Sequence, residues 1–178
     1  MSAAGLEQLR LLLREGGGLM AGLVEDDGCE TELEAGAPAL IAAAGPRAEG
    51  RRGEYELLVE AIYEGYLLHY GRPRIVGVPD ADLRLLAGDR LYAIGLARLV
   101  PLADTFAVAE LADTITLSAL AQGAGEEELA AAVWDAGARA VGWGSSPAHR
   151  RAKELVSEGS PAALEAMRTS ARAGAAPR

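Results

Sequence analysis

Apolar residues recur along this chain at the three- and four-residue spacing of helices, and Gly or Pro separates one periodic run from the next. This pattern predicts an all-α bundle of six to eight helices, with a single domain over 1–170 and a disordered tail over 171–178. The predicted helical runs are 2–15, 32–44 with an interruption near Gly36 and Pro38, 54–70, 79–101, 105–121, 126–142, 147–158 and 161–171.

The run over 54–70 is apolar on two opposite sides. At about 100° per residue, one side carries Leu57, Leu58, Ala61, Gly65 and Leu68, and the other carries Tyr55, Val59, Tyr63, Tyr66 and Tyr70. Two apolar sides predict an inner helix, with Glu56, Glu60 and Glu64 between them facing water or a cleft. The tyrosines are either core rings or the wall of an apolar ligand cavity.

The run over 79–101 opens with Pro79, which suits the first turn of a helix, and Asp80 and Asp82 favour the positive end of the helix dipole. Gly88 and Gly95 lie one heptad apart on one face of this run. Glycine costs a helix on the order of 1 kcal/mol, so the pair predicts the close approach of another helix.

Composition limits the possible partners and compartments. The 178 residues carry a net charge of −9, which argues against nucleic acid and anionic membrane surfaces as partners. The single cysteine, Cys29, rules out an internal disulfide, and a cytoplasmic location is expected. No apolar run is long enough to span a membrane, and the first residues lack the order of a signal peptide.

Three short motifs follow one another across residues 55–125. They are Leu67-Leu68-His69, Gly71-Arg72-Pro73 and Leu86-Ala87-Gly88-Asp89, and the helix after them ends at Gln122-Gly123. This order resembles the head-to-tail trans-prenyl diphosphate synthase superfamily. There a helix ending in LLHDD precedes an Arg-Arg-Gly-Arg/Lys-Pro loop and a helix carrying Leu-Ala-Gly-Asp. The resemblance implies a truncated isoprenoid-synthase-like fold.

The chain departs from that family where the family binds metal. Tyr70 and Gly71 follow His69 in place of the aspartate-rich motif whose carboxylates hold magnesium and the allylic diphosphate, and the second such motif is also absent. In what it keeps and lacks, the chain resembles the small, non-catalytic component of two-component long-chain synthases such as heptaprenyl diphosphate synthase.

Three functions are therefore open. The first is an accessory subunit of a polyprenyl diphosphate synthase, without catalysis of its own and without a cofactor, unless a catalytic partner supplies the magnesium motifs. The second is a homodimeric protein that binds an isoprenoid or another apolar ligand. The third is a divergent magnesium-dependent prenyltransferase with Glu60, Glu64 and Asp89 as a new metal set.

The candidate site residues follow from these alternatives. The expected ligand-binding residues are Tyr63, Tyr66, His69, Arg72, Arg74 and Asp89. The expected interface residues, for a homodimer or a complex with a catalytic subunit, are Gly88, Tyr92, Gly95, Leu99 and Ile115. The run over 83–102 is apolar nearly all round, so a partner would complete its burial.

The remaining motifs give weaker predictions. The acidic stretch over 26–30 imitates a magnesium motif, but Gly28 weakens the helix such a motif needs. The basic residues Arg47, Arg51 and Arg52 are either the remnant of a diphosphate site or a solvated linker. His149 stands among basic residues and is expected at the surface, and nothing indicates a nucleophile with its base.

Overall fold

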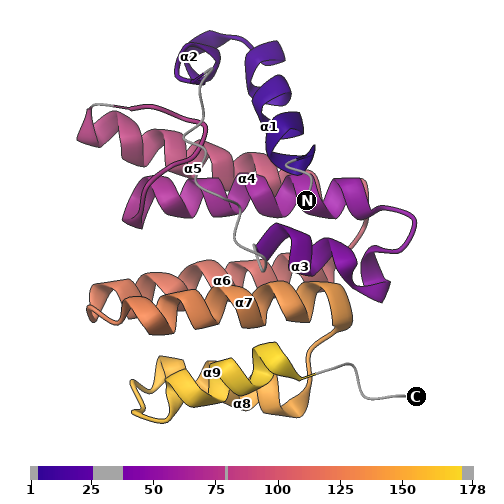
Figure 1. The fold of residues 1–178 in the computed structure, drawn as a ribbon, viewed down its shortest axis with the longest axis vertical. Coiled ribbons are helices and arrows are strands. Elements are labelled where there is room, and N and C mark those ends of the chain that lie inside the picture. Colours follow the sequence, from indigo (N-terminus) through magenta and orange to yellow (C-terminus); the bar gives the residue numbers. More distant parts are fainter. Residues whose placement is uncertain (1–3, 26–37, 79, 174–178) are drawn as a thin grey trace. The chain divides into compact units, whose positions relative to one another are not determined.

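A computed structural model describes residues 4–25, 38–78 and 80–173 of the chain (Figure 1). These residues form nine α-helices and one 3-10 helix: α1 (Ala4–Glu15), α2 (Gly18–Gly22), α3 (Pro38–Ala44), η1 (Pro46–Ala48), α4 (Arg52–Tyr70), α5 (Ala81–Ala97), α6 (Thr105–Gly123), α7 (Glu127–Trp143), α8 (Pro147–Ser157) and α9 (Ala163–Arg172). The all-α prediction is confirmed. The short α2 lies outside the predicted helical runs and adds to the expected helix count.

The chain divides into two compact units. Unit 1 comprises residues 1–39 and 51–103, and unit 2 comprises residues 40–50 and 104–178. The backbone therefore passes between the units three times, and each unit is described by itself below. A single domain over residues 1–170 stays a prediction. The predicted tail begins too early, since α9 continues to Arg172; residues 174–178 lie outside the described part.

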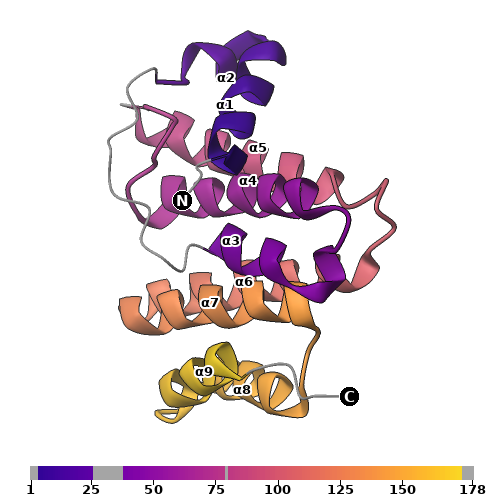
Figure 2. The ribbon, with the colours of Figure 1, turned by 45° about the vertical axis from the view of Figure 1, so that its right-hand side comes forward.

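Unit 1 is built on the pair α4 and α5, which lie side by side, with α1 packed across α4 (Figures 1 and 2). Leucines from α1 enter the core because Leu6, Leu9 and Leu13 recur on one face of that helix. The buried cluster consists of Leu6, Leu9, Leu13, Leu57, Ala61, Leu68, Ile75, Val76, Ala87 and Leu91.

A short backbone contact ties the segment after α2 to the loop between α4 and α5. Val24 and Val76 form an isolated antiparallel bridge. The N–H of Glu25 donates to the carbonyl of Ile75 at 2.9 Å, and the N–H of Gly77 donates to the carbonyl of Leu23 at 2.9 Å. The buried Ile75 and Val76 thereby join the core of unit 1 although they belong to a loop.

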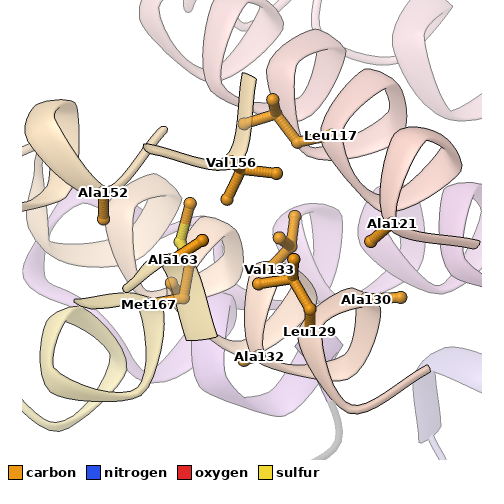
Figure 3. Close-up of a cluster of buried hydrophobic side chains, with 11 residues drawn as sticks. Leu117, Ala121, Leu129, Ala130, Ala132, Val133, Ala152, Val156, Ala163 and Met167 are labelled. Carbon is orange, nitrogen blue, oxygen red and sulfur yellow. The ribbon is translucent and has the colours of Figure 1, made fainter. Parts of the chain in front are cut away.

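Unit 2 pairs α6 with α7, and the hairpin of α8 and α9 packs against that pair (Figures 1 and 3). Alanine dominates its core, which lets the helices approach closely. The cluster in Figure 3 consists of Leu117, Ala121, Leu129, Ala130, Ala132, Val133, Ala136, Ala152, Val156, Ala163 and Met167.

Side-chain caps fix three helix starts. Asp80 accepts from the N–H of Leu83 at 2.8 Å and opens α5. Asp104 opens α6 in the same way, and Ser146 before Pro147 opens α8. Pro79 lies outside the described residues. Among the described helices, none is long and apolar enough to cross a membrane.

Candidate functional site

The glycines of α5 face α4 of the same chain. A Cβ atom at Gly95 would lie 2.4 Å from Cγ1 of Ile62 and 2.7 Å from the carbonyl oxygen of Leu58. A Cβ atom at Gly88 would lie 2.6 Å from the ring of His69. The close approach of another helix is confirmed, but the predicted interface is corrected at Gly88 and Gly95, because α4 already covers their face.

The other predicted interface residues do not share one free surface either. Leu99 is buried in unit 1. The ring of Tyr92 stacks on His69 with centroids 5.3 Å apart. Ile115 is half-buried on α6 and belongs to unit 2. An interface with a partner therefore has to use another surface than the one the glycine spacing indicated.

Rings gather where α4 ends and α5 passes it. Tyr63 stacks on Tyr66 with centroids 5.9 Å apart, and the Tyr66 and Tyr70 rings are 5.4 Å apart. Nε2 of His69 lies 3.2 Å from Oδ1 of Asp89, within ion-pair distance but not aligned as a hydrogen bond. The first and third sequence motifs thus meet in space through His69 and Asp89.

Arg74 forms a buried clamp in the loop between α4 and α5. Its Nε donates to Glu64 at 3.0 Å and its Nη2 donates to Glu60 at 2.5 Å. The backbone N–H groups of Arg74 and Ile75 donate to the other oxygen of Glu64, at 2.6 and 2.9 Å. The Glu60 and Glu64 side chains are almost fully buried, so the predicted exposure of this glutamate column is wrong at both positions.

In the clamp, burial and the neighbouring opposite charges shift the pKa values in opposite directions. Burial raises the pKa of the Glu60 carboxyl above its ordinary value, and the neighbouring Arg74 offsets this only in part. Burial by itself would lower the pKa of Arg74, but the charges of Glu60 and Glu64 raise it. A single cation that is always protonated is therefore shared between two carboxyl groups that have little contact with water.

The predicted ligand residues do not form one site. The guanidinium of Arg74 lies 5.2 Å from the ring centre of Tyr63, so these two predicted ligand residues are in contact. Arg74 nevertheless uses its donors inside the protein. Arg72 is exposed. The predicted set thus separates into the clamp with Tyr63, the ring cluster of Tyr66, His69 and Asp89, and the exposed Arg72.

The alternative metal set is not assembled. Glu60 and Glu64 are bound by Arg74, whereas Asp89 lies at His69. No group of three or more His, Cys, Asp or Glu side chains among the described residues could hold a metal ion. The acidic stretch over 26–30, including Cys29, lies outside those residues.

Arg47 takes a structural position that neither sequence alternative anticipated. Its Nη2 donates to both oxygens of Asp104, at 2.7 and 2.9 Å, and its Nε donates to the carbonyl of Val141 at 3.1 Å. The guanidinium also lies over the Phe106 ring. Arg47 therefore holds the start of α6 in unit 2. Arg51 belongs to unit 1 and donates to the carbonyl of Leu102 at 3.3 Å, and Arg52 is exposed in that unit.

An apolar groove runs along unit 1 between α1, α2 and the outer side of α5. It consists of two adjoining cavities of about 330 and 750 Å³, and Leu12, Gly16, Arg90 and Ile94 line both of them. The smaller cavity continues to Leu13, Gly17, Leu19, Met20, Leu83, Leu86 and Ala87, and the larger to Glu54, Ala93, Ala97, Arg98, Pro101 and Leu102. The size suits a ligand or a helix of a partner.

Large apolar side chains stand open to water at this groove. Leu19 is 64% exposed and Leu86 is 65% exposed. On α5 the exposed face is centred on Leu86, Arg90, Ala93 and Ala97, opposite the face of Gly88 and Gly95 that contacts α4. Exposed apolar surface of this kind is a feature that many interaction sites share.

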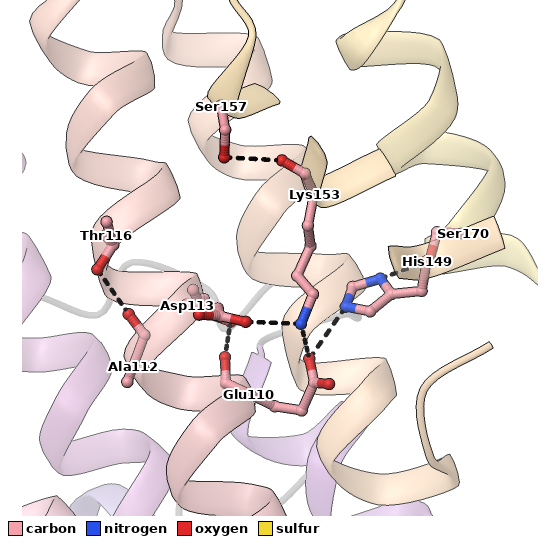
Figure 4. Close-up of polar contacts among 9 residues, drawn as sticks. Glu110, Ala112, Asp113, Thr116, His149, Lys153, Ser157 and Ser170 are labelled. Carbon is pink, nitrogen blue, oxygen red and sulfur yellow. Dashed lines mark hydrogen bonds and ion pairs between the residues drawn. The ribbon is translucent and has the colours of Figure 1, made fainter. Parts of the chain in front are cut away.

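Unit 2 contains a buried polar network that the sequence did not reveal (Figure 4). Nδ1 of His149 lies 2.8 Å from Oγ of Ser170, and Nε2 lies 3.2 Å from Oε2 of Glu110. Nζ of Lys153 donates to the same Glu110 oxygen at 3.0 Å and to Asp113 at 2.7 Å. The predicted surface position of His149 is wrong, since the residue is only 3% exposed.

The order Ser170, His149, Glu110 imitates a nucleophile, its base and an acid. Ser170 is buried as well, however, and the network joins α6, α8 and α9 from inside. Burial by itself would raise the pKa of the Glu110 carboxyl, but hydrogen bonds from His149 and Lys153 lower it below its ordinary value. The helical spacing of His149 with Lys153, and of Glu110 with Asp113, was the available sequence signal.

No family model matches this chain, and neither does any curated protein or solved structure with which it was compared.

Proposed function

We propose that this chain is a non-catalytic accessory subunit of a polyprenyl diphosphate synthase, and that it acts in the cytoplasm by docking on a catalytic partner. The observation that carries the proposal is the solvent-facing groove of unit 1 with its exposed leucines. The partner would be the subunit that holds the aspartate-rich motifs and magnesium.

The groove favours a protein partner on energetic grounds. Burying apolar surface stabilises a complex by about 25 cal/mol per Å², and Leu19 and Leu86 leave most of their surface in water. Both side chains line the same cavity, so one docking element could cover them together. The residue types around them are those of an interface centre, with the charged groups few and placed apart.

The clamp supports a non-catalytic role. Glu60 and Glu64 are the carboxylates nearest the end of α4, and Arg74 binds both. The positions after His69 hold Tyr70 and Gly71. Ionisation of a diphosphate needs a cation to stabilise the departing charge, and these side chains offer no anionic ligands to a second cation.

Co-expression with the catalytic polyprenyl diphosphate synthase encoded in the same genome tests the proposal. Size-exclusion chromatography with light scattering should show a complex, and the complex should make longer or more product than the catalytic subunit alone. Leu86→Glu should abolish the complex, because the charge would have to be buried in the groove.

Leu120→Glu is the matched control, since Leu120 is a comparably exposed leucine on α6 in unit 2. It should leave the complex intact. If the two chains elute separately at micromolar concentration, or if both substitutions act alike, the docking role is refuted. Prenyl transfer by the purified chain alone would overturn the non-catalytic assignment.

A further inference from the structure

The groove of unit 1 has the features of a site for one helix. We infer that its occupant is an amphipathic helix of the partner protein that carries a carboxylate at its centre, opposite Arg90. The inference rests on the proposed docking function and names the element that docks. Three features of α5 and α1 support it.

The first feature is the spacing of the exposed face of α5. Leu86, Arg90, Ala93 and Ala97 follow one another at intervals of four, three and four residues, which is the spacing of a helix–helix seam. All four are exposed and all four line the groove. Because the opposite face of α5 packs on α4, this seam is the free side of the helix.

The second feature is the distribution of side-chain size. Ala93, Ala97 and Gly16 leave a shallow stretch where another backbone can approach closely. Leu86 and Leu19 at one end and Leu102 at the other give larger contacts. From Leu86 to Ala97, where α5 ends, the helix rises about 16 Å, so a partner helix of roughly three turns would follow this seam.

The third feature is charge. Arg90 lies where the two cavities meet, and it forms no ion pair with a carboxylate of the described residues. Arg98, the other cation of the groove, already pairs with Glu54 at 3.2 Å. Asp89 precedes Arg90 but lies at His69. Arg90 is thus the groove cation that has no carboxylate partner among the described residues, and it complements a carboxylate from a partner.

Synthetic peptides provide the test. An 18-residue Ala- and Lys-based helical peptide with Leu at its seam positions would carry Glu, Gln or Lys at the central seam position. Fluorescence anisotropy would measure its binding to the full chain. We expect the Glu peptide to bind roughly tenfold more tightly than the Lys peptide, with Gln between them.

A charge reversal then assigns the effect to one residue. Arg90→Glu should reverse the order so that the Lys peptide binds best, while circular dichroism shows unchanged helicity. Arg52→Glu is the matched control, because Arg52 is an exposed arginine of unit 1 outside the groove, and it should keep the original order. Leu86→Glu should weaken all three peptides.

The other outcomes separate this inference from the docking function. Equal binding of the three peptides, lost in Leu86→Glu, would overturn the role of Arg90 and leave docking intact. Self-association that Leu86→Glu abolishes, without peptide binding, would assign the groove to a second copy and overturn the inference. Binding of farnesol without any peptide would assign it to a small apolar ligand and overturn both. If the unmutated chain is a monomer and binds neither the peptides nor farnesol, both the inference and the docking function are overturned.

Discussion

Both units bury a glutamate of a long helix, but they satisfy it with different chemistry. In unit 1, Glu64 accepts from Arg74 and from two backbone N–H groups of the loop that follows α4. In unit 2, Glu110 accepts from His149 and Lys153 on α8, two helices further along the chain. The partners of Glu64 are one arginine and two backbone amides, whereas those of Glu110 are an imidazole and an ammonium group.

The clamp of unit 1 and the polar network of unit 2 therefore connect different parts of the chain. The clamp of unit 1 fixes a loop on the helix that precedes it, within a span of about ten residues. The network of unit 2 instead joins side chains of three helices, α6, α8 and α9. The two units should therefore differ in how much the loss of a buried carboxylate costs and in how acid affects them.

The largest loss of stability should come from removing Glu64 from the clamp of unit 1. Glu64→Ala leaves the Nε of Arg74 and two backbone N–H groups without their acceptor, and breaking a buried pair in this way costs about 3–5 kcal/mol. Urea unfolding followed by circular dichroism would measure the change in the free energy of unfolding. Glu54 lies on the same helix as Glu64 and forms an exposed pair with Arg98 at the end of α5. Glu54→Ala should cost less than about 1 kcal/mol. Equal costs would contradict the comparison.

Helix spacing provides a second contrast. Gly95→Ala should destabilise the chain by about 1–3 kcal/mol, because the new methyl group meets a backbone carbonyl that cannot move aside. Gly137→Ala in α7 should cost less, since its nearest neighbour at 2.0 Å is the side-chain oxygen of Thr114, which can rotate. Gly53→Ala meets nothing within 4 Å and should stabilise α4 by about 0.5–1 kcal/mol. Thermal unfolding of the three variants would rank them.

Acid should affect the two units with opposite sign. Because the pKa of Glu60 is raised in the folded chain, proton uptake as pH falls from 7 towards the ordinary glutamate value favours folded unit 1. The lowered pKa of Glu110 stabilises unit 2 fully above that ordinary value, and this contribution is lost as pH falls through the folded pKa. Hydrogen exchange, expressed as protection factors, should show α6 and α8 opening below about pH 4.5 while α4 stays protected.

Glu110→Gln is the control for the acid response. It removes the titrating carboxyl but keeps an acceptor for Lys153, so the protection of α8 should lose most of its dependence on pH in this range. If the protection of α4 falls with pH together with that of α8, the opposite pKa shifts of Glu60 and Glu110 do not act on the two units separately. The contrast would then fail.

The smallest effect should come from the surface end of the network. Asp113→Asn removes an exposed partner of Lys153, and such pairs contribute about 0.2–1 kcal/mol. Added salt should reduce the difference between the variant and the unmutated chain, because exposed charges are screened. A cost as large as that of Glu110→Gln would mean that Asp113, and not Glu110, positions Lys153.

Local signals predicted the helices of unit 2 well. The expected runs over 105–121, 126–142 and 147–158 agree with α6, α7 and α8 to within a few residues. The reason is that Asp104 and Ser146 cap the starts of α6 and α8 by accepting from N–H groups three residues away. Gly125 and Gly144 follow the ends of α6 and α7 and have positive φ. All these contacts lie within one turn of the chain.

The site could not be predicted in the same way because its contacts are long-range. The helical wheel placed Glu60 and Glu64 between two apolar sides, but it contains no information on Arg74 beyond the end of the helix. The basic neighbours of His149 suggested a surface residue, although α8 turns it towards Glu110, 39 residues earlier. The glycines of α5 predicted a close helix without indicating whose helix it was.

The backbone contact between Leu23–Glu25 and Ile75–Gly77 has a consequence for the time course of synthesis. The segment after α2 cannot find its bonding partners until the loop some fifty residues later has left the ribosome. At about 5–20 residues per second, this delay is several seconds. During that interval the leucines of α1 lie open to other chains, so a mutation that slows the pairing of Val24 with Val76 should lower the yield of soluble protein before it changes the finished fold.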